Sequence, residues 1–365
     1  MEQKIKILYV VSTLASSGPT NQLLNIIRNL DQDYFRAKVI TLSSEPKNSL
    51  KYKYDALGID VVSLNMTRLQ GLLQSKSVLK AYINDFAPAV IHTQGIRADS
   101  LLSKLKLQTP WVMTSRNYPF DDYPMKFGAL KGNLMAYSHI AAMRRCHNVV
   151  ACSKTIASVL TKHKIVATPI QNGVHSEPVS NMVESVELPR YDAPVFISVG
   201  SLIPRKNMGL LIEAFNRYSK DHKGSLLILG GGPEQSALEG QVESEHIHIL
   251  GAVNNVRDYL SVSDYFLSAS LSEGLPNTVL EGLASGLPAL LSNIPSHEEI
   301  ESESSECSNI FALEKGVDEL LEKMVLVNRI FDKNASDSAL NLAQTVLSAE
   351  TMSKKYQALY QSLLK

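Results

Sequence analysis

The chain has 365 residues, which suits two domains of ordinary size, and its 44% hydrophobic and 20% charged residues are typical of a globular protein. No apolar run approaches the roughly 18 residues that a membrane-spanning helix needs. The three cysteines, Cys146, Cys152 and Cys307, form no C-x-x-C pair and no even set. This excludes a disulfide framework and favours a reducing cytoplasm.

The net charge of zero hides an asymmetry between the two halves of the chain. Residues 1–180 hold 22 Lys and Arg against 11 Asp and Glu, whereas residues 181–365 hold 14 against 25. A basic N-terminal half can face an anionic membrane or an anionic substrate. The alternative is two solvated surfaces of opposite sign, and the sequence leaves both interpretations open.

Short apolar runs alternate with amphipathic stretches in the first half, a pattern that predicts βα units and a parallel sheet. The short apolar run after Lys4 favours a first buried strand over a signal peptide. The strands predicted here are Ile5–Val11, Ala37–Leu42, Asp60–Ser63, Ala89–Thr93, Trp111–Ser115, Asn148–Cys152 and Thr168–Ile170.

The alternation stops after this half, where prolines and acids without periodicity predict an interdomain linker, which we place at 176–194. It then resumes with strands predicted at Val195–Val199, Ser225–Leu229, His246–Leu250, Tyr265–Ser268, Pro288–Ser292 and Ser308–Phe311. The pattern predicts an α/β protein with two doubly wound, Rossmann-like domains. Ligands of such sheets bind beyond the carboxyl ends of the strands, so the loops after the strands are the candidate sites.

The strongest local signal is the segment from Ser272 to Pro288. Pro276 suits the first position of a helix, and Gly286 suits its end, so Glu273 is predicted in the loop before the helix and Glu281 on it. The helix N-terminus between the two carboxylates offers an anion site. A sugar nucleotide has hydroxyls on both sides of its diphosphate, which is the ligand this spacing suggests. Two glutamates eight residues apart are also common by chance.

The segment resembles the E-x7-E motif of the retaining family 4 glycosyltransferases, with its surrounding E-G-L-P-N-x-x-L-E-x-x-A-x-G-x-P pattern nearly complete. Val199–Asn207 resembles the family's diphosphate-clamping strand and loop, Leu229–Glu234 its Gly-rich turn, and Leu250–Val253 the segment against the base. The resemblance implies a GT-B fold, in which two Rossmann-like domains face each other across a cleft. It implies an acceptor domain at 1–175 completed by a C-terminal helix at 348–365, and a nucleotide-sugar domain at 195–347.

The resemblance also implies roles for individual residues, most of them on the donor side. Lys206 and Arg205 would neutralise the departing diphosphate, and Glu273 would orient the transferred sugar. The remaining donor contacts implied are Gly18, Val253, Gly274, Leu275, Asn277, Thr278 and Glu281, with Glu281 on the ribose hydroxyls.

Three departures from the family pattern concern the phosphate and acceptor sides. Ser201 stands where the family often has Arg, and Gly18-Pro19 where a Gly-Gly pair is common. Two histidine positions of the N-terminal domain are Gln94 and Arg116 here. The acceptor-side residues implied by the resemblance are His92, Gln94, Arg116 and Asn117.

We predict no metal site and no cofactor. Asp31-Gln32-Asp33 matches a short metal-binding pattern, but it follows an amphipathic helix at Gln22–Leu30 and precedes a strand, which favours a solvated turn. The resemblance likewise implies transfer with retention of anomeric configuration and without a divalent metal. No nucleic-acid-binding module is recognisable.

One region of the basic half bears on a membrane partner. Met125–Arg145 is predicted as an amphipathic helical region interrupted near Gly132, with most of its apolar residues packed on the sheet. The apolar residues of the region include Phe127, Leu130, Leu134, Met135, Ile140 and Met143, with Lys126, Lys131, Arg144 and Arg145 beside them. With the wider basic surface, it predicts reversible docking of a cytoplasmic enzyme on an anionic inner membrane face.

The function expected is transfer of a hexose-type sugar from a nucleotide diphosphate donor, with UDP favoured over GDP, to a glycan or lipid-linked glycan. The resemblance implies a place in bacterial surface polysaccharide synthesis. Two alternatives stay open: a sugar-nucleotide epimerase of the same architecture, and a nucleotide-sugar-binding protein without turnover. Release of free nucleoside diphosphate separates the transferase from both.

Overall fold

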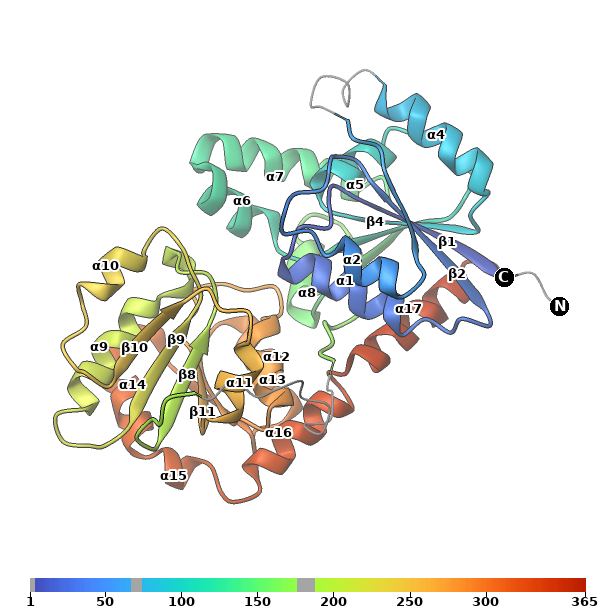
Figure 1. Ribbon diagram of the computed structural model, residues 1–365. Helices are drawn as coiled ribbons and strands as arrows, with labels where there is room; N and C mark the ends of the chain where they lie inside the picture. The colour runs from blue at the N-terminus through green and yellow to red at the C-terminus, as the bar shows by residue number, and fades with distance from the viewer. Residues whose placement is uncertain (1–3, 67–73, 176–187) are drawn as a thin grey trace. The chain divides into compact units, whose positions relative to one another are not determined.

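The chain folds into two units, each built on its own parallel sheet (Figure 1). The computed structural model describes residues 4–66, 74–175 and 188–365. Unit 1 comprises Met1–Gly173 and Ala349–Lys365, and unit 2 comprises Val174–Ser348. Residues 176–187 of the predicted linker lie outside the described residues.

The described part of unit 1 holds a seven-stranded parallel sheet in the order β3-β2-β1-β4-β5-β6-β7. Its strands are β1 (Ile5–Val11), β2 (Phe35–Thr41), β3 (Asp60–Ser63), β4 (Val90–Gln94), β5 (Trp111–Ser115), β6 (Asn148–Ala151) and β7 (Ala167–Pro169). Its helices are α1 (Gly18–Arg28), α2 (Lys51–Ala56), α4 (Ser75–Phe86), α5 (Ile96–Leu102), α6 (Pro119–Phe127), α7 (Ala129–Met143), α8 (Lys154–Thr161) and α17 (Ala349–Ser362). The central strands are Val- and Ile-rich and buried, as expected of a parallel sheet covered on both faces.

Unit 2 holds, in its described residues, a six-stranded parallel sheet in the order β10-β9-β8-β11-β12-β13, the doubly wound arrangement of nucleotide-binding folds. Its strands are β8 (Val195–Val199), β9 (Ser225–Leu229), β10 (Ile247–Gly251), β11 (Tyr265–Ser268), β12 (Ala289–Ser292) and β13 (Ser308–Phe311). Its helices are η2 (Pro204–Lys206), α9 (Met208–Tyr218), α10 (Gln235–Glu239), α11 (Val256–Ser261), α12 (Asn277–Ala284), α13 (Pro295–Glu303), η3 (Leu313–Lys315), α14 (Gly316–Val325), α15 (Val327–Ile330) and α16 (Ala335–Gln344). The strand order reverses between β8 and β11, and a ligand of such a sheet binds at the carboxyl ends there.

The final helix, α17, belongs to unit 1, which confirms the predicted return of the chain end to the N-terminal domain. Tyr356 and Tyr360 of this helix are fully buried in the unit 1 core, and Met352 joins them. The Ser353 hydroxyl donates to the Ile26 carbonyl of α1 at 2.8 Å. In Figure 1, α17 lies alongside α1.

Each strand predicted from the sequence is present, with ends that differ by at most two residues. The largest difference is in β2, which begins at Phe35 rather than at Ala37. Phe35 is a buried residue of the core, and its amide donates to the Asp31 carbonyl in the preceding turn. That turn, with exposed Asp31 and Asp33, is the predicted solvated turn.

The predicted break near Gly132 is wrong. The helical region divides at Gly128, whose φ of 80° lies in the left-handed region that favours glycine, and α6 ends there while α7 begins. Gly132 lies inside α7, where an added Cβ would be only 2.4 Å from the backbone of Pro124 on α6. Gly132 therefore serves close packing of the two helices, which lie side by side in Figure 1.

The prediction that most apolar residues of this region pack on the sheet is also wrong. Leu130 is 81% exposed and Leu134 is 64% exposed, whereas Ile140 and Met143 are buried. Other large exposed side chains of the pair are Met125, Phe127 and Tyr137. Leu130, Leu134 and Tyr137 are spaced i, i+4 and i+7, so they share one face of α7. We call Met125, Phe127, Leu130, Leu134 and Tyr137 the apolar stripe.

Candidate functional site

The segments that follow β8, β10 and β11 carry the predicted donor residues of unit 2. The loop after β8 forms the short helix η2 with Arg205 and Lys206. Asn207 follows with φ of 52°, a left-handed conformation that Asn tolerates better than most residues, and this turn starts α9. The turn places the Lys206 side chain over Gly200, at the end of β8.

The loop after β11 leads into α12 and carries both glutamates. The sequence predicted Pro276 as the first helical residue of α12. In the structure Pro276 is the N-cap of this helix instead, because its ψ of 107° is extended. The helix begins at Asn277, so Asn277 and Thr278 are its first two residues, without an acidic side chain in the first turn. Glu273 lies before the cap and Glu281 on the helix, on either side of this positive end, as predicted.

Glu273 bridges the two cations of η2. Its Oε1 lies 2.7 Å from Lys206 Nζ, and its Oε2 lies 2.6 Å from Arg205 Nη1. Arg205 Nη1 also donates to the Ser272 carbonyl at 2.6 Å. Burial alone would raise the pKa of Glu273, but Lys206 and Arg205 outweigh it and lower this pKa to about 2. Glu273 is therefore ionised at neutral pH.

A buried row of hydroxyls and one imidazole lies behind Glu273. Ser270 donates to Glu273 Oε1 at 3.1 Å, and Ser268 lies 3.4 Å from both Ser270 and His297 Nε2. His297 Nδ1 lies 3.0 Å from the Ser292 carbonyl, which can only accept, so Nδ1 carries the proton. Burial lowers the pKa of His297 to about 4, which leaves the ring neutral at neutral pH. Sequence reasoning missed Ser270, although it stands close to Glu273 in the chain, and it missed His297, which only the fold brings to this row.

Glu281 has the opposite electrostatic character from Glu273. Burial raises its pKa to about 7, although the nearby cations Arg257 and Lys206 act to lower it. Arg257, on α11, was not predicted. It is exposed, and its Nη2 donates to the His175 carbonyl at 3.3 Å. Val253, just before α11, is partly buried against the unit 2 core.

The Gly-rich turn after β9 packs directly on the loop after β8. Gly230 has φ of 135°, and an added Cβ would lie only 1.9 Å from the Gly200 carbonyl oxygen. The Leu202 amide also donates to the Gly231 carbonyl at 3.0 Å. The glycines therefore allow two loops to meet backbone to backbone beside Lys206.

Gly274 and Leu275 are buried, with the Leu275 side chain in the core. Ser201 is exposed, and Arg205 and Lys206 are the cations on Glu273 in this loop.

The predicted donor residue in unit 1, Gly18, is the first residue of α1 and not part of the preceding loop. Ser17 caps this helix by accepting from the Thr20 amide, and Thr20 returns a contact to the Ser17 amide. Gly18 thus lies at the N-terminus of an eleven-residue helix, which follows the carboxyl end of β1.

The four predicted acceptor-side residues divide between the core and the sheet edge of unit 1. His92 is buried, with Nδ1 2.6 Å from the Tyr360 hydroxyl and Nε2 2.8 Å from the Thr114 hydroxyl. Burial, with Arg116, lowers the pKa of His92 to about 3. The structure therefore places the His92 ring between α17 and the strands β4 and β5, in the core of unit 1.

The other three lie at the carboxyl ends of β4 and β5. Gln94 and Arg116 are buried and hydrogen-bonded to each other, with Arg116 Nε donating to Gln94 Oε1 at 2.8 Å. Asn117 is partly buried, and its carbonyl accepts from the Ser115 hydroxyl.

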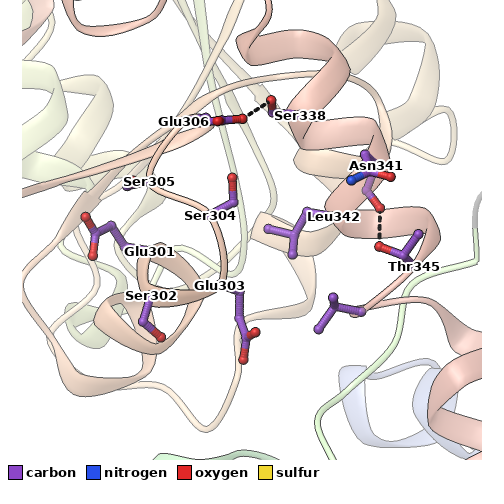
Figure 2. A pocket seen from close by; sticks show the side chains of 11 residues that line it. Glu301, Ser302, Glu303, Ser304, Ser305, Glu306, Ser338, Asn341, Leu342 and Thr345 are labelled. Carbon is purple, nitrogen blue, oxygen red and sulfur yellow. Dashed lines mark hydrogen bonds between the residues drawn. The ribbon is translucent and has the colours of Figure 1, made fainter.

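A separate cavity of about 560 Å³ lies in unit 2 between the end of α13 and α16 (Figure 2). It is lined by Glu301, Glu303, Glu306 and hydroxyl side chains, and Glu306 accepts from Ser338 at 2.6 Å. A cavity with this acidic lining repels a diphosphate, and it shares no residue with the Glu273 site. Within the described residues, no group of three or more His, Cys, Asp or Glu side chains is placed to hold a metal ion.

Comparison with known proteins identifies the family. Residues 193–329 match the model described as glycosyl transferases group 1, and residues 17–172 match the glycosyl transferase 4-like domain. The chain is 25% identical over 305 residues to the O-antigen biosynthesis glycosyltransferase WclY of Escherichia coli, covering 80% of this chain and 81% of that one. It is 29% identical over 139 residues to a UDP-Gal:alpha-D-GlcNAc-diphosphoundecaprenol alpha-1,3-galactosyltransferase of the same species, covering 34% and 36% of the two chains.

Solved structures agree on the architecture. The Anabaena protein HepE, determined in complex with UDP, superposes with a TM-score of 0.77 at 14% identity, over 98% of this chain and all of the other. Together with the two doubly wound sheets, this likeness establishes the GT-B fold. Both domain models match in the order and units expected, so the chain belongs to the family 4 glycosyltransferases.

Proposed function

We propose that the protein is a retaining, metal-independent hexosyltransferase that uses a nucleotide diphosphate sugar, with unit 2 binding the donor and unit 1 the acceptor. The observation that carries this proposal is the pairing of Glu273 with Lys206 and Arg205 beside the N-terminus of α12. Two cations and a helix dipole then converge where a diphosphate leaves, and Glu281 on the same helix stands one turn further on.

In this proposal the donor displaces part of an existing ion-pair cluster. In the structure, the Glu273 carboxylate is ion-paired with both cations. The donor diphosphate takes Lys206 and Arg205, and Glu273, with the amides of Gly274 and Leu275, turns to the hydroxyls of the transferred sugar. The amides of Asn277 and Thr278 supply further phosphate contacts. Arg205 compensates for Ser201, which stands where the family often has an arginine.

UDP is the favoured nucleotide, with Val253 against the base and Glu281 on the ribose. HepE has been determined with UDP, with UDP and glucose, and with UDP-glucose. Thermal shift with a panel of UDP- and GDP-hexoses, followed by measurement of free nucleoside diphosphate, tests the proposal. Acceptor-dependent release of UDP supports it. An epimerase would interconvert donors without release, and a binding protein would do neither.

The pH dependence of nucleotide binding should report Glu281. Ribose hydroxyls donate to a carboxylate, and the pKa of Glu281 is raised to about 7, so the carboxyl group loses its charge as pH falls below 7. Affinity for UDP should therefore fall by up to about tenfold between pH 8 and pH 6. Titration calorimetry on the wild type and Glu281→Gln measures this, and the variant controls for protonation of UDP itself. Parallel pH profiles for the two proteins would contradict the assignment.

Activity should survive removal of divalent metals. Lys206 and Arg205 supply the positive charge on the leaving group, and Asp31 and Asp33 lie in an exposed turn. We expect turnover after EDTA treatment and gel filtration to stay within about twofold of the untreated enzyme. Complete loss that magnesium or manganese restores would reject metal independence and make the two aspartates candidates again.

The acceptor is proposed to be a glycan or a lipid-linked glycan of bacterial surface polysaccharide, by analogy with the O-antigen and diphosphoundecaprenol acceptors in the names of the relatives. Gln94, Arg116 and Asn117 would line its site at the carboxyl ends of β4 and β5. A lipid-linked acceptor places the enzyme in the cytoplasm against the inner membrane face.

Membrane docking is proposed to use the apolar stripe of α6 and α7. The exposed lysines Lys126 and Lys131 lie within the same pair of helices, and the first half of the chain is basic. Apolar side chains can enter the headgroup region while Lys131 contributes about 1 kcal/mol on anionic lipid. Lys126 is already paired with Asp122 at 2.9 Å. Among the described residues, none of the helices has the length and apolar character needed to cross a bilayer.

Vesicle flotation tests this docking. Binding to vesicles with anionic lipid should exceed binding to neutral ones and weaken with salt, since exposed charges are screened within about 8 Å at physiological ionic strength. Leu130→Glu with Leu134→Glu should lower binding by about tenfold or more. Val166→Glu, at a 90% exposed apolar residue off the stripe, is the matched control. Equal, negligible binding of the wild type to both vesicles would exclude docking.

A further inference from the structure

Arg116 brings a buried positive charge to the edge of the unit 1 sheet, directly after β5. Only 8% of the residue is exposed. Nε donates to Gln94 Oε1 at 2.8 Å, and Nη1 donates to Asn172 Oδ1 at 2.7 Å. Nη2 is buried, and within the described residues it has no hydrogen-bond partner. A guanidinium stays charged at every relevant pH, so both a charge and a donor are left uncompensated here.

The groups around Arg116 do not supply a counter-charge. Its two partners are neutral amides. The titratable groups that its charge influences are Tyr54, His92, Tyr356 and Tyr360. Burial raises the pKa of each tyrosine and lowers that of His92, so all four are neutral at pH 7. The ion pairs found among the described residues do not include Arg116.

Two neighbouring features also leave the positive charge of Arg116 uncompensated. Glu45, which also influences Tyr54, is engaged elsewhere, with its oxygens accepting from the Leu14 amide and the Ser49 hydroxyl. The Gln94 amide that accepts from Arg116 donates in turn to the Pro19 carbonyl at 2.8 Å, in the first turn of α1. That turn has no acidic residue. A cation beside the positive end of a helix is unfavourable, and an anion there would satisfy both.

We infer that Arg116 recognises a negatively charged oxygen group, a phosphate or a carboxylate, on the acceptor. This rests on the proposed function, which assigns the acceptor to unit 1. A buried, incompletely paired charge destabilises the folded chain, and an oxyanion that accepts from Nη2 removes this destabilisation only when the ligand is bound. The neutral amides of Gln94 and Asn172 hold the fork in place. An acceptor without charge at this point would leave Arg116 unpaired and bind more weakly.

Thermal unfolding of the full chain tests this in a Lys206→Ala background, which weakens anion binding at the donor site. The probes are inorganic phosphate, methyl glucuronide and neutral methyl glucoside, with ionic strength matched by NaCl. Phosphate or the glucuronide should raise Tm saturably by about 3 °C, and the glucoside should not. Adding Arg116→Gln should abolish the rise, and Arg116→Lys should keep part of it. Arg145→Gln, at an exposed arginine of unit 1, is the matched control.

Each outcome decides the inference. A response to phosphate alone assigns a phosphorylated acceptor, and a response to the glucuronide assigns an acidic sugar. A response to neither, or one that persists in Arg116→Gln, overturns it. Loss of UDP affinity in Arg116→Gln with Lys206 intact would place the residue on the donor and also overturns it. If Arg116→Gln does not fold, the same comparisons use Arg116→Lys, for which a response equal to that of the parent is the contrary result. UDP binding by the wild type, measured separately, shows whether the proposed function itself holds.

Discussion

Replacing Lys206 with alanine is expected to lower turnover roughly 10²–10³-fold, the usual cost of removing one preorganised group that stabilises developing charge. Lys206 Nζ lies 2.7 Å from Glu273, and the Lys206 side chain packs over Gly200 at the end of β8, so contacts within unit 2 hold its position. A cation already in place needs no reorganisation when the diphosphate leaves. Steady-state release of nucleoside diphosphate measures the effect.

The variant must stay folded for this result to be interpreted. Arg205 remains on Glu273 in Lys206→Ala, so the buried carboxylate keeps one counter-ion and Tm should change by only a few degrees. Lys220→Ala, at an exposed lysine of unit 2, is the control and should leave turnover unchanged. Near-normal turnover in folded Lys206→Ala would remove the assignment.

Glutamine at Glu273 and at Glu281 should produce different defects. Glu273→Gln should lower turnover by about 10²-fold while affinity for UDP is kept or increased, because Lys206 and Arg205 no longer have Glu273 as a competing anion. Glu281→Gln should weaken UDP binding by about ten- to a hundredfold, the value of a hydrogen bond to a charged group. Calorimetric titration with UDP and single-turnover kinetics separate the two effects.

Each variant serves as the control of the other, since both change one carboxylate to an amide of the same shape. Glu273→Gln removes the anion from a buried cluster, so its Tm should be checked before its kinetics. An equal loss of UDP affinity in the two variants would show that the division between sugar and ribose is wrong.

Strands were the part of the fold that pattern alone could predict, because most are short apolar runs bounded by turn residues, as in Val195–Val199. The break between α6 and α7 was not predictable in this way. Gly128 and Gly132 look equivalent in sequence, and only the approach of Pro124 shows that the second packs and the first turns. The same reasoning predicted that Leu130 and Leu134 pack on the sheet, whereas both are exposed. Periodicity defines one face of a helix but does not show what covers that face.

In the site, sequence placed Glu273 and Glu281 on either side of a helix start, because that depends on local spacing. It did not show that Glu273 holds both cations, that Ser270 and His297 stand behind it, or that the pKa values of the two glutamates lie near 2 and 7. The two cations and His297 are distant from Glu273 in sequence, the contact of Ser270 depends on how the loop turns, and the pKa values depend on burial. In unit 1, the surroundings of His92 could not be predicted either, since its hydrogen-bond partner Tyr360 is 268 positions away in the sequence.

The return of α17 to unit 1 has a consequence for how the protein is made. Tyr356 and Tyr360 fill the core built by β1, β4 and α1, and His92 finds its hydrogen-bond partner only there. The first half of the chain leaves the ribosome long before these residues do, so unit 2 is synthesised in full while the core of unit 1 still lacks a helix. Domains generally fold as units, N-terminal first, as they emerge. In this protein the N-terminal unit cannot complete its core until α17, which follows unit 2 along the chain, has emerged.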